Sequence, residues 1–515
     1  MSRAVFVAAG ILISRISGFI RARVFAHYFG LSDSADAFNA AFRIPNFLQN
    51  LFGEGALSAS FIPVYAALVS RGRRIEADRV AGAIFSLVAA VISVLVLAGV
   101  LATPLMIALI APGFTGAKRE LAVTLTRILF PGTGMLVLSA WCLGILNSHH
   151  RFTLSYAAPL MMNAAMIAAM ALFGSGRDLS TLAVYLAWGA VLGSVLQFAV
   201  QLPVVLAVAP DLRFGLDLAS EHVRTIARNF VPAFVSRGVV QLSAYIDSLL
   251  ASLLPTGAVT GLMNASLLYT LPVSLFGVSV AASELPAMSG DASLEGAGAE
   301  AVRVRLDAGL RRIAFFVVPS SVAFIALGDV VAGAVLQTGR FTRSETEYVW
   351  AILAGSAIGL VASTLGRLYS STFYALRDTR TPLRFAIVRV TLTTALGYLC
   401  AIPLPHLLGL PARWGAAGLT ASAGLAGWVE MLLLRNALRR RIGSTGMPAA
   451  YVASLWGAAI AGGAVGWLVK WRVPPLHPVL HGAAVLVPYG LTYFAVALVL
   501  RVPEAAATIR RVVRR

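Results

Sequence analysis

Residues 42–63 read FRIPNFLQNLFGEGALSASFIP, and this stretch combines an apolar composition with charge. Arg43, Asn46, Asn50 and Glu54 follow one another at spacings of three or four residues. Side chains at that spacing share one face of an α-helix. The stretch therefore predicts a helix with an apolar body and one polar stripe, an unusual combination if the helix lies in a lipid bilayer.

The composition of the whole chain is typical of a polytopic membrane protein. Of its 515 residues, 58% are hydrophobic and 12% are charged, whereas soluble proteins carry about 25% charged residues. A membrane-spanning helix needs roughly 20 mostly apolar residues. We predict an all-α integral membrane protein with about fourteen such helices, beginning near residues 4, 36, 80, 121, 153, 181, 229, 260, 313, 346, 384, 415, 449 and 480.

The formal net charge of +19 comes almost entirely from arginine, since Lys118 and Lys470 are the only lysines. The arginines gather in every second predicted loop, within residues 71–79, 213–228, 303–312, 377–384, 435–441 and 510–515. Positive residues flank membrane helices mainly on the cytoplasmic side. This pattern predicts a multi-pass membrane protein with both termini in the cytoplasm, and it argues against a nucleic-acid partner.

The sequence gives no sign of catalytic, nucleotide-binding or metal-binding chemistry. It contains no GxxxxGK[ST], HExxH or GxSxG motif. Cys142 and Cys400 lie in separate predicted spans, and the pair His149–His150 has no carboxylate or thiol nearby to complete a metal site. We therefore expect a transporter without a cofactor or metal, and not an enzyme.

Two long polar connections, residues 209–228 and 289–312, interrupt the series of spans and could hold short helices on the membrane surface. The first connection falls after the sixth span. We therefore predict two six-helix lobes around a central cavity, residues 1–210 and 211–442, followed by two extra helices and a basic tail in residues 443–515. Sequence similarity between the lobes is too weak to establish a repeat.

Ionisable residues concentrate in the first two predicted spans. A charged side chain at the bilayer centre costs roughly 3 kcal/mol and usually faces a cavity or a partner. At 3.6 residues per turn, seven residues of the second span fall within an arc of about 120°, and Pro45, Gly53 and Gly55 should allow that helix to bend. The first span contributes Arg15, Arg21 and Arg23; the stripe consists of Asp36, Asn39, Arg43, Asn46, Asn50, Glu54 and Ser58.

The positive charges of these two spans outnumber the carboxylates, so we predict a cavity for an anionic, phosphate-bearing substrate, which arginine binds bidentately. The alternative is that the charges pair with one another, for example Arg15 or Arg21 with Asp36 or Glu54, and only lock helices together. In the seventh span, Arg237 and Asp247 either face the same cavity or make a local contact. Glu284 and Arg367 are further intramembrane charges, and Glu284 is interpreted as lying near the cytoplasmic end.

The segment RIPNFLQNLFGEGALSASFIP resembles the signature of the MurJ/MviN family, the lipid II flippases of bacterial peptidoglycan synthesis. Supporting similarity extends over most of the chain, in SRISGFIRARVFAHYFG (14–30), SADAFNAAFRIPN (34–46), APGF (111–114), LGILNSHHRF (143–152), LPVSLFGVSVAASELP (271–286), LQTGRFT (336–342) and FYALRDTRTPLR (373–384). The resemblance implies the fold of the multidrug/oligosaccharidyl-lipid/polysaccharide exporters and alternating access. It also implies contact with membrane lipids and with the cell-wall synthesis machinery.

The resemblance also assigns roles to residues. Arg15, Arg21, Asp36 and Glu54 match functional positions of the family. Gln49–Asn50 and Ser266–Leu267 depart from it, because many members carry an arginine pair and an Asp-Arg pair there. Our hypothesis is that Arg237 supplies the missing charge. The predicted substrate-binding set is Arg15, Arg21, Asp36, Arg43, Asn46, Asn50, Glu54 and Arg237.

The predicted function is that of a flippase for lipid II, an undecaprenyl-diphosphate-linked peptidoglycan precursor. The last two helices are predicted to hold the polyprenyl tail. Three alternatives stay open. The chain could move another lipid-linked glycan, such as an exopolysaccharide or O-antigen precursor. A cation or drug antiporter would need a cavity dominated by carboxylates, and a membrane glycosyltransferase would need a catalytic loop with paired carboxylates.

Overall fold

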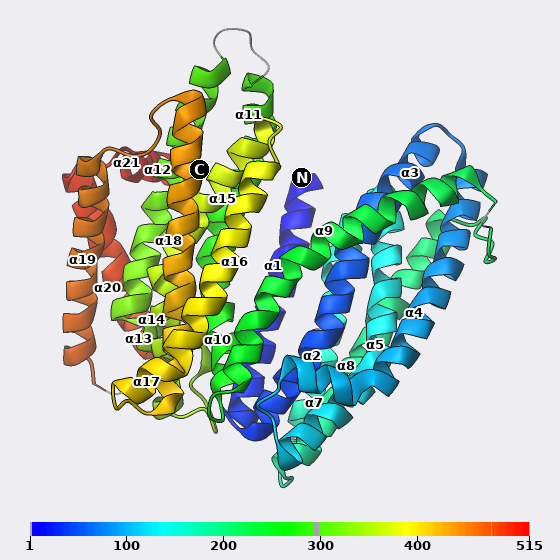
Figure 1. The fold of residues 1–515 in the computed structure, drawn as a ribbon, viewed down its shortest axis with the longest axis horizontal. Coiled ribbons are helices and arrows are strands. Elements are labelled where there is room, and N and C mark those ends of the chain that lie inside the picture. The colour runs from blue at the N-terminus through cyan, green and yellow to red at the C-terminus, as the bar shows by residue number, and fades with distance from the viewer. Residues whose placement is uncertain (1–2, 218, 293–297, 475, 514–515) are drawn as a thin grey trace. The chain divides into compact units, whose positions relative to one another are not determined.

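The computed structural model describes the backbone of residues 3–217, 219–292, 298–474 and 476–513. It also describes their side chains, except those of residues 3–12, 53–55, 233, 235–244, 509 and 511–513. The described chain is almost entirely helical and divides into two compact units (Figure 1). Unit 1 comprises residues 1–260 and 338–340; unit 2 comprises residues 261–337 and 341–515.

Unit 1 consists of long helices joined by short loops. The helices α4, α5 and α8 pack in sequence, with α5 between the other two, and α9 packs against η1, α3 and α4. The elements are α1 (Arg3–Phe29), α2 (Asp33–Leu48), the π-helix η1 (Gln49–Leu57), α3 (Ser58–Ser70), α4 (Arg74–Ile110), α5 (Gly116–Ser148), α6 (Phe152–Ala157), α7 (Pro159–Phe173), α8 (Leu179–Val208) and α9 (Glu221–Ser252).

Unit 2 contains the remaining helices. In it, α19 and α20 pack against each other and lie against α12 and α13 (Figure 1). The elements are α10 (Ala258–Pro272), whose first turn belongs to unit 1, the π-helix η2 (Val273–Val278), α11 (Ser279–Asp291), α12 (Gly298–Ala326), α13 (Gly328–Leu336), α14 (Arg343–Ile358), α15 (Leu360–Ala375), α16 (Arg380–Ala401), α17 (Pro403–Leu407), the 3₁₀-helix η3 (Ala412–Trp414), α18 (Gly415–Ile442), α19 (Ala449–Arg472), α20 (Pro478–Val499) and α21 (Pro503–Val513).

The fold confirms the prediction of an all-α membrane protein. In the described chain, ten helices are long and apolar enough to span a bilayer, and eleven if the bent pair α14–α15 is one span. The other three predicted spans fall on α1, on α2 with η1 and α3, and on α9, which are helical but carry several charged residues. The count of fourteen therefore stays a prediction.

The predicted surface helices in the two long connections are not found among the described residues. Residues 221–228 and 298–312 form no separate surface helices, because they are the first turns of the long helices α9 and α12. The compact units divide after Thr260 and not at residue 210, since α9 packs with unit 1 through Phe230 and Phe234, whose rings contact Phe52. The compact units are defined by contacts within the chain and do not show which helices move together. The division into lobes 1–210 and 211–442 with the extra helices of 443–515 therefore stays a prediction.

The core of unit 1 is built where α3, α4 and α5 meet. Phe61, Tyr65 and Trp141 are fully buried there, and the indole N–H of Trp141 donates to the carbonyl of Ala81 at 3.0 Å. Gly144 lets α3 approach α5, since a Cβ at this position would lie 3.1 Å from the ring of Phe61. This packing fixes the end of unit 1 that carries the α3–α4 and α5–α6 loops.

Both units contain a π-helix within a membrane helix. In unit 1, η1 covers LFGEGAL (51–57) and follows Pro45; in unit 2, η2 covers LFGV (275–278) and directly follows Pro272. The segments LFGEGALSASFIP (51–63) and LFGVSVAASELP (275–286) share LFG and end in a similar SxxP pattern. The two π-helices thus lie in segments that share a few sequence positions. Such π-helical segments are rare and often lie at functional sites.

Candidate functional site

The predicted polar stripe does not run straight along one helix. Its first part lies on α2 and its last part on η1, where the i→i+5 pattern of a π-helix turns successive side chains by a smaller angle than an α-helix does. An arc calculated at 3.6 residues per turn is therefore wrong beyond Leu48. Asn46 is partly exposed and Asn50 is exposed, and the side chain of Glu54 lies outside the described residues.

Asp36 is buried inside unit 1, where it forms an ion pair with a lysine and not with an arginine. Only 1% of its surface is exposed, and Oδ2 lies 2.8 Å from Nζ of Lys118 on α5. Oδ2 also accepts a hydrogen bond from the backbone N–H of Gly257, and Oδ1 accepts from the N–H and the hydroxyl of Thr260. The alternative in which Asp36 pairs with Arg15 or Arg21 does not hold in the described structure, because four donors from α5 and the start of α10 already occupy the carboxylate.

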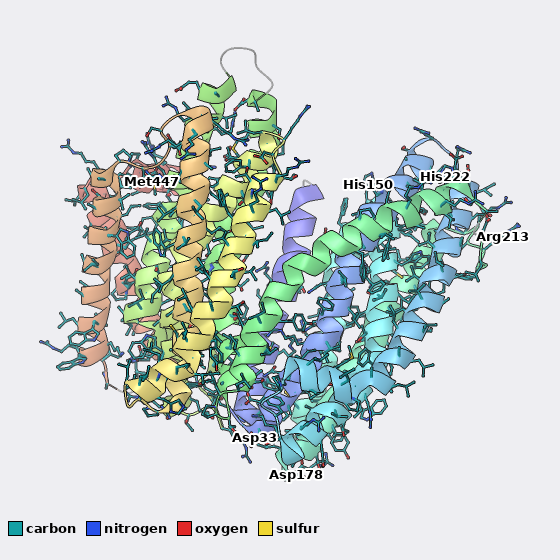
Figure 2. All side chains as sticks on the ribbon, viewed as in Figure 1. Asp33, His150, Asp178, Arg213, His222 and Met447 are labelled. Atoms are coloured by element: carbon teal, nitrogen blue, oxygen red, sulfur yellow. The ribbon has the colours of Figure 1, made fainter. Side chains whose placement is uncertain are left out.

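The neighbours of Asp36 extend this network at one end of unit 1. Lys118 also pairs with Asp33 at 2.9 Å, and Asp33 accepts a hydrogen bond from the hydroxyl of Thr256 at 2.7 Å. One turn along α2, Asn39 donates to the Thr260 hydroxyl at 3.1 Å. Figure 2 shows Asp33 at the opposite end of unit 1 from His150 and His222. We call the set Asp33, Asp36, Asn39, Lys118, Thr256, Gly257 and Thr260 the Asp36 network.

Lys118 was missed as a site residue by the sequence reasoning. A signal did exist, because Lys118 is one of two lysines in a chain that uses arginine everywhere else. Nothing in the spacing along the chain, however, indicates that α5 brings Lys118 to Asp36, 82 residues away.

Arg21 lies in α1 and contacts residues of α2 and α7. Its Nη1 lies 3.6 Å from Sδ of Met166 on α7, and its guanidinium lies 5.7 Å from the ring centroid of Phe42 on α2. Among the residues that the structure describes, no acidic side chain forms an ion pair with it. A guanidinium held by a thioether and an aromatic ring keeps most of its five N–H donors for another acceptor.

Arg15 faces a different part of unit 1. It is six residues from Arg21, so the two side chains leave α1 in directions more than 90° apart. Arg15 lines a cavity of about 470 Å³ between α1, α3, α5 and α6. The cavity is also lined by Ser14, Ser58, Ile62, Leu143, Asn147, Ser155, Tyr156 and Pro159.

Arg43 contacts α9. Its guanidinium lies 5.3 Å from the ring centroid of Tyr245, and the Tyr245 hydroxyl donates to the Arg43 carbonyl at 3.2 Å. The ring of Phe47 packs edge-on against the same tyrosine. The stripe of α2 therefore meets residues 245–260 through Asp36, Asn39 and Arg43, which makes this part of the stripe a helix–helix contact. The Arg237 side chain lies outside the described residues.

Unit 2 has its own intramembrane charges. Arg389 on α16 pairs with Glu430 on α18 at 3.1 Å, and neither residue was predicted to matter. Arg367 on α15 is exposed. Glu284 pairs with Arg305 at 3.5 Å and with Arg312 at 3.4 Å, which supports its interpretation as a structural residue near the end of a span.

Comparison with known proteins identifies the family. The family model "Lipid II flippase MurJ" matches residues 25–481. The chain belongs to the MurJ family. Among curated members of the MurJ family, the lipid II flippase MurJ of Burkholderia cenocepacia is 32% identical over 514 residues, covering 97% of each chain. The probable lipid II flippase MurJ of Rhizobium meliloti is 31% identical over 432 residues, covering 83% of this chain and 78% of its own.

Solved structures agree on the fold. A lipid II flippase MurJ in an inward closed conformation superposes with a TM-score of 0.79 at 23% identity, covering 96% of this chain and 99% of its own. An inward-facing MATE multidrug transporter superposes with a TM-score of 0.67 at 17% identity, covering 86% of this chain and 100% of its own. Membership of the MurJ family, together with the ten or more apolar helices, makes the chain a multi-pass protein of the bacterial inner membrane, in a family of transporters and not of enzymes.

Proposed function

We propose that this chain is a lipid II flippase that moves the undecaprenyl-diphosphate-linked peptidoglycan precursor from the inner to the outer leaflet by alternating access. Membership of the MurJ family supports this function, and the relatives that match over most of the chain are named lipid II flippases. The observation in the molecule that carries the proposal is Arg21, a membrane arginine whose described surroundings contain no carboxylate partner.

Arg21 is suited to bind the diphosphate. A guanidinium in a membrane helix is costly unless a partner compensates it, and a diphosphate offers several charged oxygen acceptors for its planar N–H fork. Met166 and Phe42 contact Arg21 without neutralising it, so these contacts would orient the side chain and leave its charge for the substrate.

The other predicted substrate contacts enter the proposal with different roles. Arg15 would bind the substrate from the cavity that it lines, and Asn46 and Asn50 would donate from their exposed amides. Arg43, placed by Tyr245, would attract the diphosphate electrostatically, and Glu54 would act as a gate. Arg237 keeps its proposed role of replacing the arginine that the family usually carries near Leu267.

The Asp36 network would hold one end of unit 1 closed. Its ion pair joins α2 to α5, and its hydrogen bonds join α2 to the first turn of α10. Because α10 continues into unit 2 beyond Thr260, any movement of α10 relative to α2 must break these bonds. We therefore assign Asp36 to gating and not to direct substrate contact.

The arginine-rich loops would face the cytoplasm, as would both termini. The Asp36 network would then lie near the outer surface. The helices α19 and α20 would accommodate the polyprenyl tail; α19 exposes Trp467 and Trp471, whose stacked rings suit the membrane interface. Contact with the enzymes of cell-wall synthesis stays a prediction from the resemblance.

Complementation tests the function. A bacterium depleted of its own lipid II flippase should grow when it expresses this chain, and lipid II should become accessible at the outer leaflet. Failure there, together with translocation of an exopolysaccharide or O-antigen precursor, would move the assignment to another lipid-linked glycan. Efflux of cations or drugs without either activity would favour an antiporter.

A second set of variants tests the arginines. Arg21→Ala, Arg15→Ala and Arg43→Ala should each lower outer-leaflet lipid II in the complemented strain, and Arg21→Ala should have the largest effect. Arg177→Ala is the control, because Arg177 only stacks on Phe173 and Tyr185 near the end of α7. Full translocation by all three variants would contradict the proposed diphosphate site.

A further inference from the structure

A second polar cavity lies in unit 1 at the end opposite the Asp36 network, and the proposed transport function does not use it. It has a volume of about 840 Å³ and is formed by the start of α4, the preceding loop, and the loop that leads into α9. Its lining consists of Gly72, Arg73, Arg74, Ile75, Glu76, Arg79, Val80, Asp217, Ser220, Glu221 and His222.

The cavity lies at the level of the lipid headgroups. Its arginines begin α4, a 37-residue helix that is apolar enough to span the bilayer, so the first turn of α4 marks a membrane surface. The side chains of Ile75, Phe214 and Leu216 are large, apolar and 57%, 57% and 64% exposed. Exposed apolar groups next to arginines are expected where a protein meets the boundary between headgroups and acyl chains.

Residues 209–217 of the loop before α9 lie along α4 at this boundary. Asp211 N–H donates to Asp78 at 3.1 Å, the ring of Phe214 contacts Phe85, and Gly215 N–H donates to Ser86 at 3.0 Å. Gly82 is required, because a Cβ there would lie 2.1 Å from the carbonyl oxygen of Arg213. The loop thus forms one fixed wall of the cavity, not a mobile cover.

The charges in the cavity are of two kinds. Glu76 already pairs with Arg73 at 2.5 Å, and its other oxygen lies 3.2 Å from Nε2 of His222. Arg74 and Arg79 form no ion pair with any described residue, and neither do Asp217 and Glu221. One oxygen of Asp217 accepts a hydrogen bond from the backbone N–H of Ser220 at 3.1 Å, which leaves its other oxygen for a ligand. Among the described residues, the cavity therefore presents two guanidinium groups and two carboxylates without a charged partner.

Two helices also begin at this cavity. Neither Arg73 before α4 nor Ser220 before α9 caps its helix with a side-chain hydrogen bond. Their first N–H groups and the positive ends of the two helix dipoles add to the attraction of a phosphate. The carboxylates of Asp217 and Glu221 provide acceptors for a group that carries both a positive charge and N–H donors.

We propose that this cavity binds the headgroup of an aminophospholipid, a phosphodiester linked to a primary ammonium. Arg74, Arg79 and the helix N–H groups hold the phosphodiester, and Asp217 and Glu221 hold the ammonium. The acyl chains lie against the exposed apolar side chains of Ile75 and Leu216. A site of this kind fixes the start of α4 and α9 to one leaflet, and it is independent of the transported substrate.

Lipid binding to the purified full-length chain tests the proposal, measured by native mass spectrometry with phosphatidylethanolamine, phosphatidylglycerol or phosphatidylcholine added in steps. Phosphatidylethanolamine should bind best. Arg79→Ala should lower the affinity for phosphatidylethanolamine and for phosphatidylglycerol by roughly tenfold each, which is the effect of losing one charge-assisted hydrogen bond. Glu221→Gln should lower the affinity for phosphatidylethanolamine alone. Arg71→Ala is the matched control, since Arg71 is an exposed arginine of the same loop outside the lining.

Three results would overturn the proposal. Equal binding by wild type and Arg79→Ala, with both proteins unfolding at the same temperature, would show that the cavity is no lipid site. Tighter binding of phosphatidylglycerol than of phosphatidylethanolamine, unchanged by Glu221→Gln, would remove the ammonium subsite. If soluble phosphoethanolamine or inorganic phosphate displaced phosphatidylethanolamine as well as a second lipid molecule does, the cavity would be a site for free anions and not for a lipid. If Arg79→Ala does not fold, Arg79→Gln gives the same comparison.

Discussion

At the scale of single residues, Asp36 shows how a buried charge is made tolerable. Its carboxylate is 1% exposed, and a lysine, two backbone N–H groups and a hydroxyl compensate it. Buried charges are stable only when they are both paired and hydrogen-bonded. Removing one donor therefore affects more than the contact that it makes, because the remaining charge stays buried.

Lys118→Met should destabilise the protein by about 3 kcal/mol, the usual result of leaving one partner of a buried ion pair uncompensated. Thermal unfolding in detergent measures the effect. Arg119→Met is the control, because Arg119 is its exposed neighbour. The double variant Lys118→Met/Asp36→Asn should be more stable than Lys118→Met alone, since it no longer buries a charge. An additive loss in the double variant would contradict the role of this ion pair.

His149 should make stability depend on pH. Its Nε2 lies 2.9 Å from the hydroxyl of the fully buried Tyr65, which also donates to Asp78. Burial, and then the positive charges of Arg74, His150 and Arg151, lower the pKa of His149 below its ordinary value. The unfolded chain therefore binds this proton more readily than the folded chain, and folding stability falls as the pH drops below about 6.5.

Melting curves recorded at several pH values between 7.5 and 5.5 check this prediction. The melting temperature of the wild type should fall over this range by more than that of His149→Gln. His150→Gln should behave as the wild type, because His150 is exposed. Parallel curves for the wild type and His149→Gln would contradict the prediction, because they would show that His149 has the same pKa in the folded and the unfolded chain.

At the scale of elements, the π-helices are where sequence reasoning was least successful. The apolar periodicity predicted helices at the right places, and Pro45 and the glycines near Glu54 predicted a bend. The change from an α- to a π-pattern could not be predicted, because it depends on how the neighbouring helices pack and not on local propensity. In unit 2, Gly277 within η2 allows α15 to approach: a Cβ there would lie 2.5 Å from Cγ2 of Thr364.

Gly277→Ala should therefore destabilise unit 2 by about 1–3 kcal/mol, the usual cost of overpacking. Thr364→Ser removes the opposing methyl group and keeps the hydroxyl that donates to the Leu360 carbonyl, so it should restore most of the stability in the double variant. Gly490→Ala is the control, because a Cβ there meets nothing within 4 Å. Unfolding temperatures of the four variants provide the measurement, and a double variant no more stable than Gly277→Ala would contradict this account of the contact.

At the scale of the whole molecule, charge and hydropathy are enough to predict an all-α membrane transporter. The length of the apolar segments is dictated by the bilayer, so the starts of most helices follow from the sequence within a few residues. The partners of the charged residues do not follow from it. Lys118 and Thr260 reach Asp36, and Tyr245 reaches Arg43, only because the helices fold back on one another.

The same limit applies to the predicted substrate site. The residues Arg15, Arg21 and Arg43 were chosen as one set, but the structure gives them three different surroundings: a polar cavity, a thioether with a ring, and a tyrosine of α9. The described contacts of Arg21 are with a thioether and an aromatic ring, and no carboxylate or hydroxyl is among them. The account therefore depends most on Arg21 and on the anion that it binds.

Translocation of fluorescent lipid II in proteoliposomes containing the purified chain tests that claim most directly. The wild type should expose lipid II to a quencher added outside, Arg21→Lys should retain part of the rate, and Arg21→Ala should lower it at least tenfold, the loss of about one charge-assisted hydrogen bond. Arg177→Ala should match the wild type. Translocation by Arg21→Ala at the wild-type rate, or no translocation by the wild type, would contradict the account.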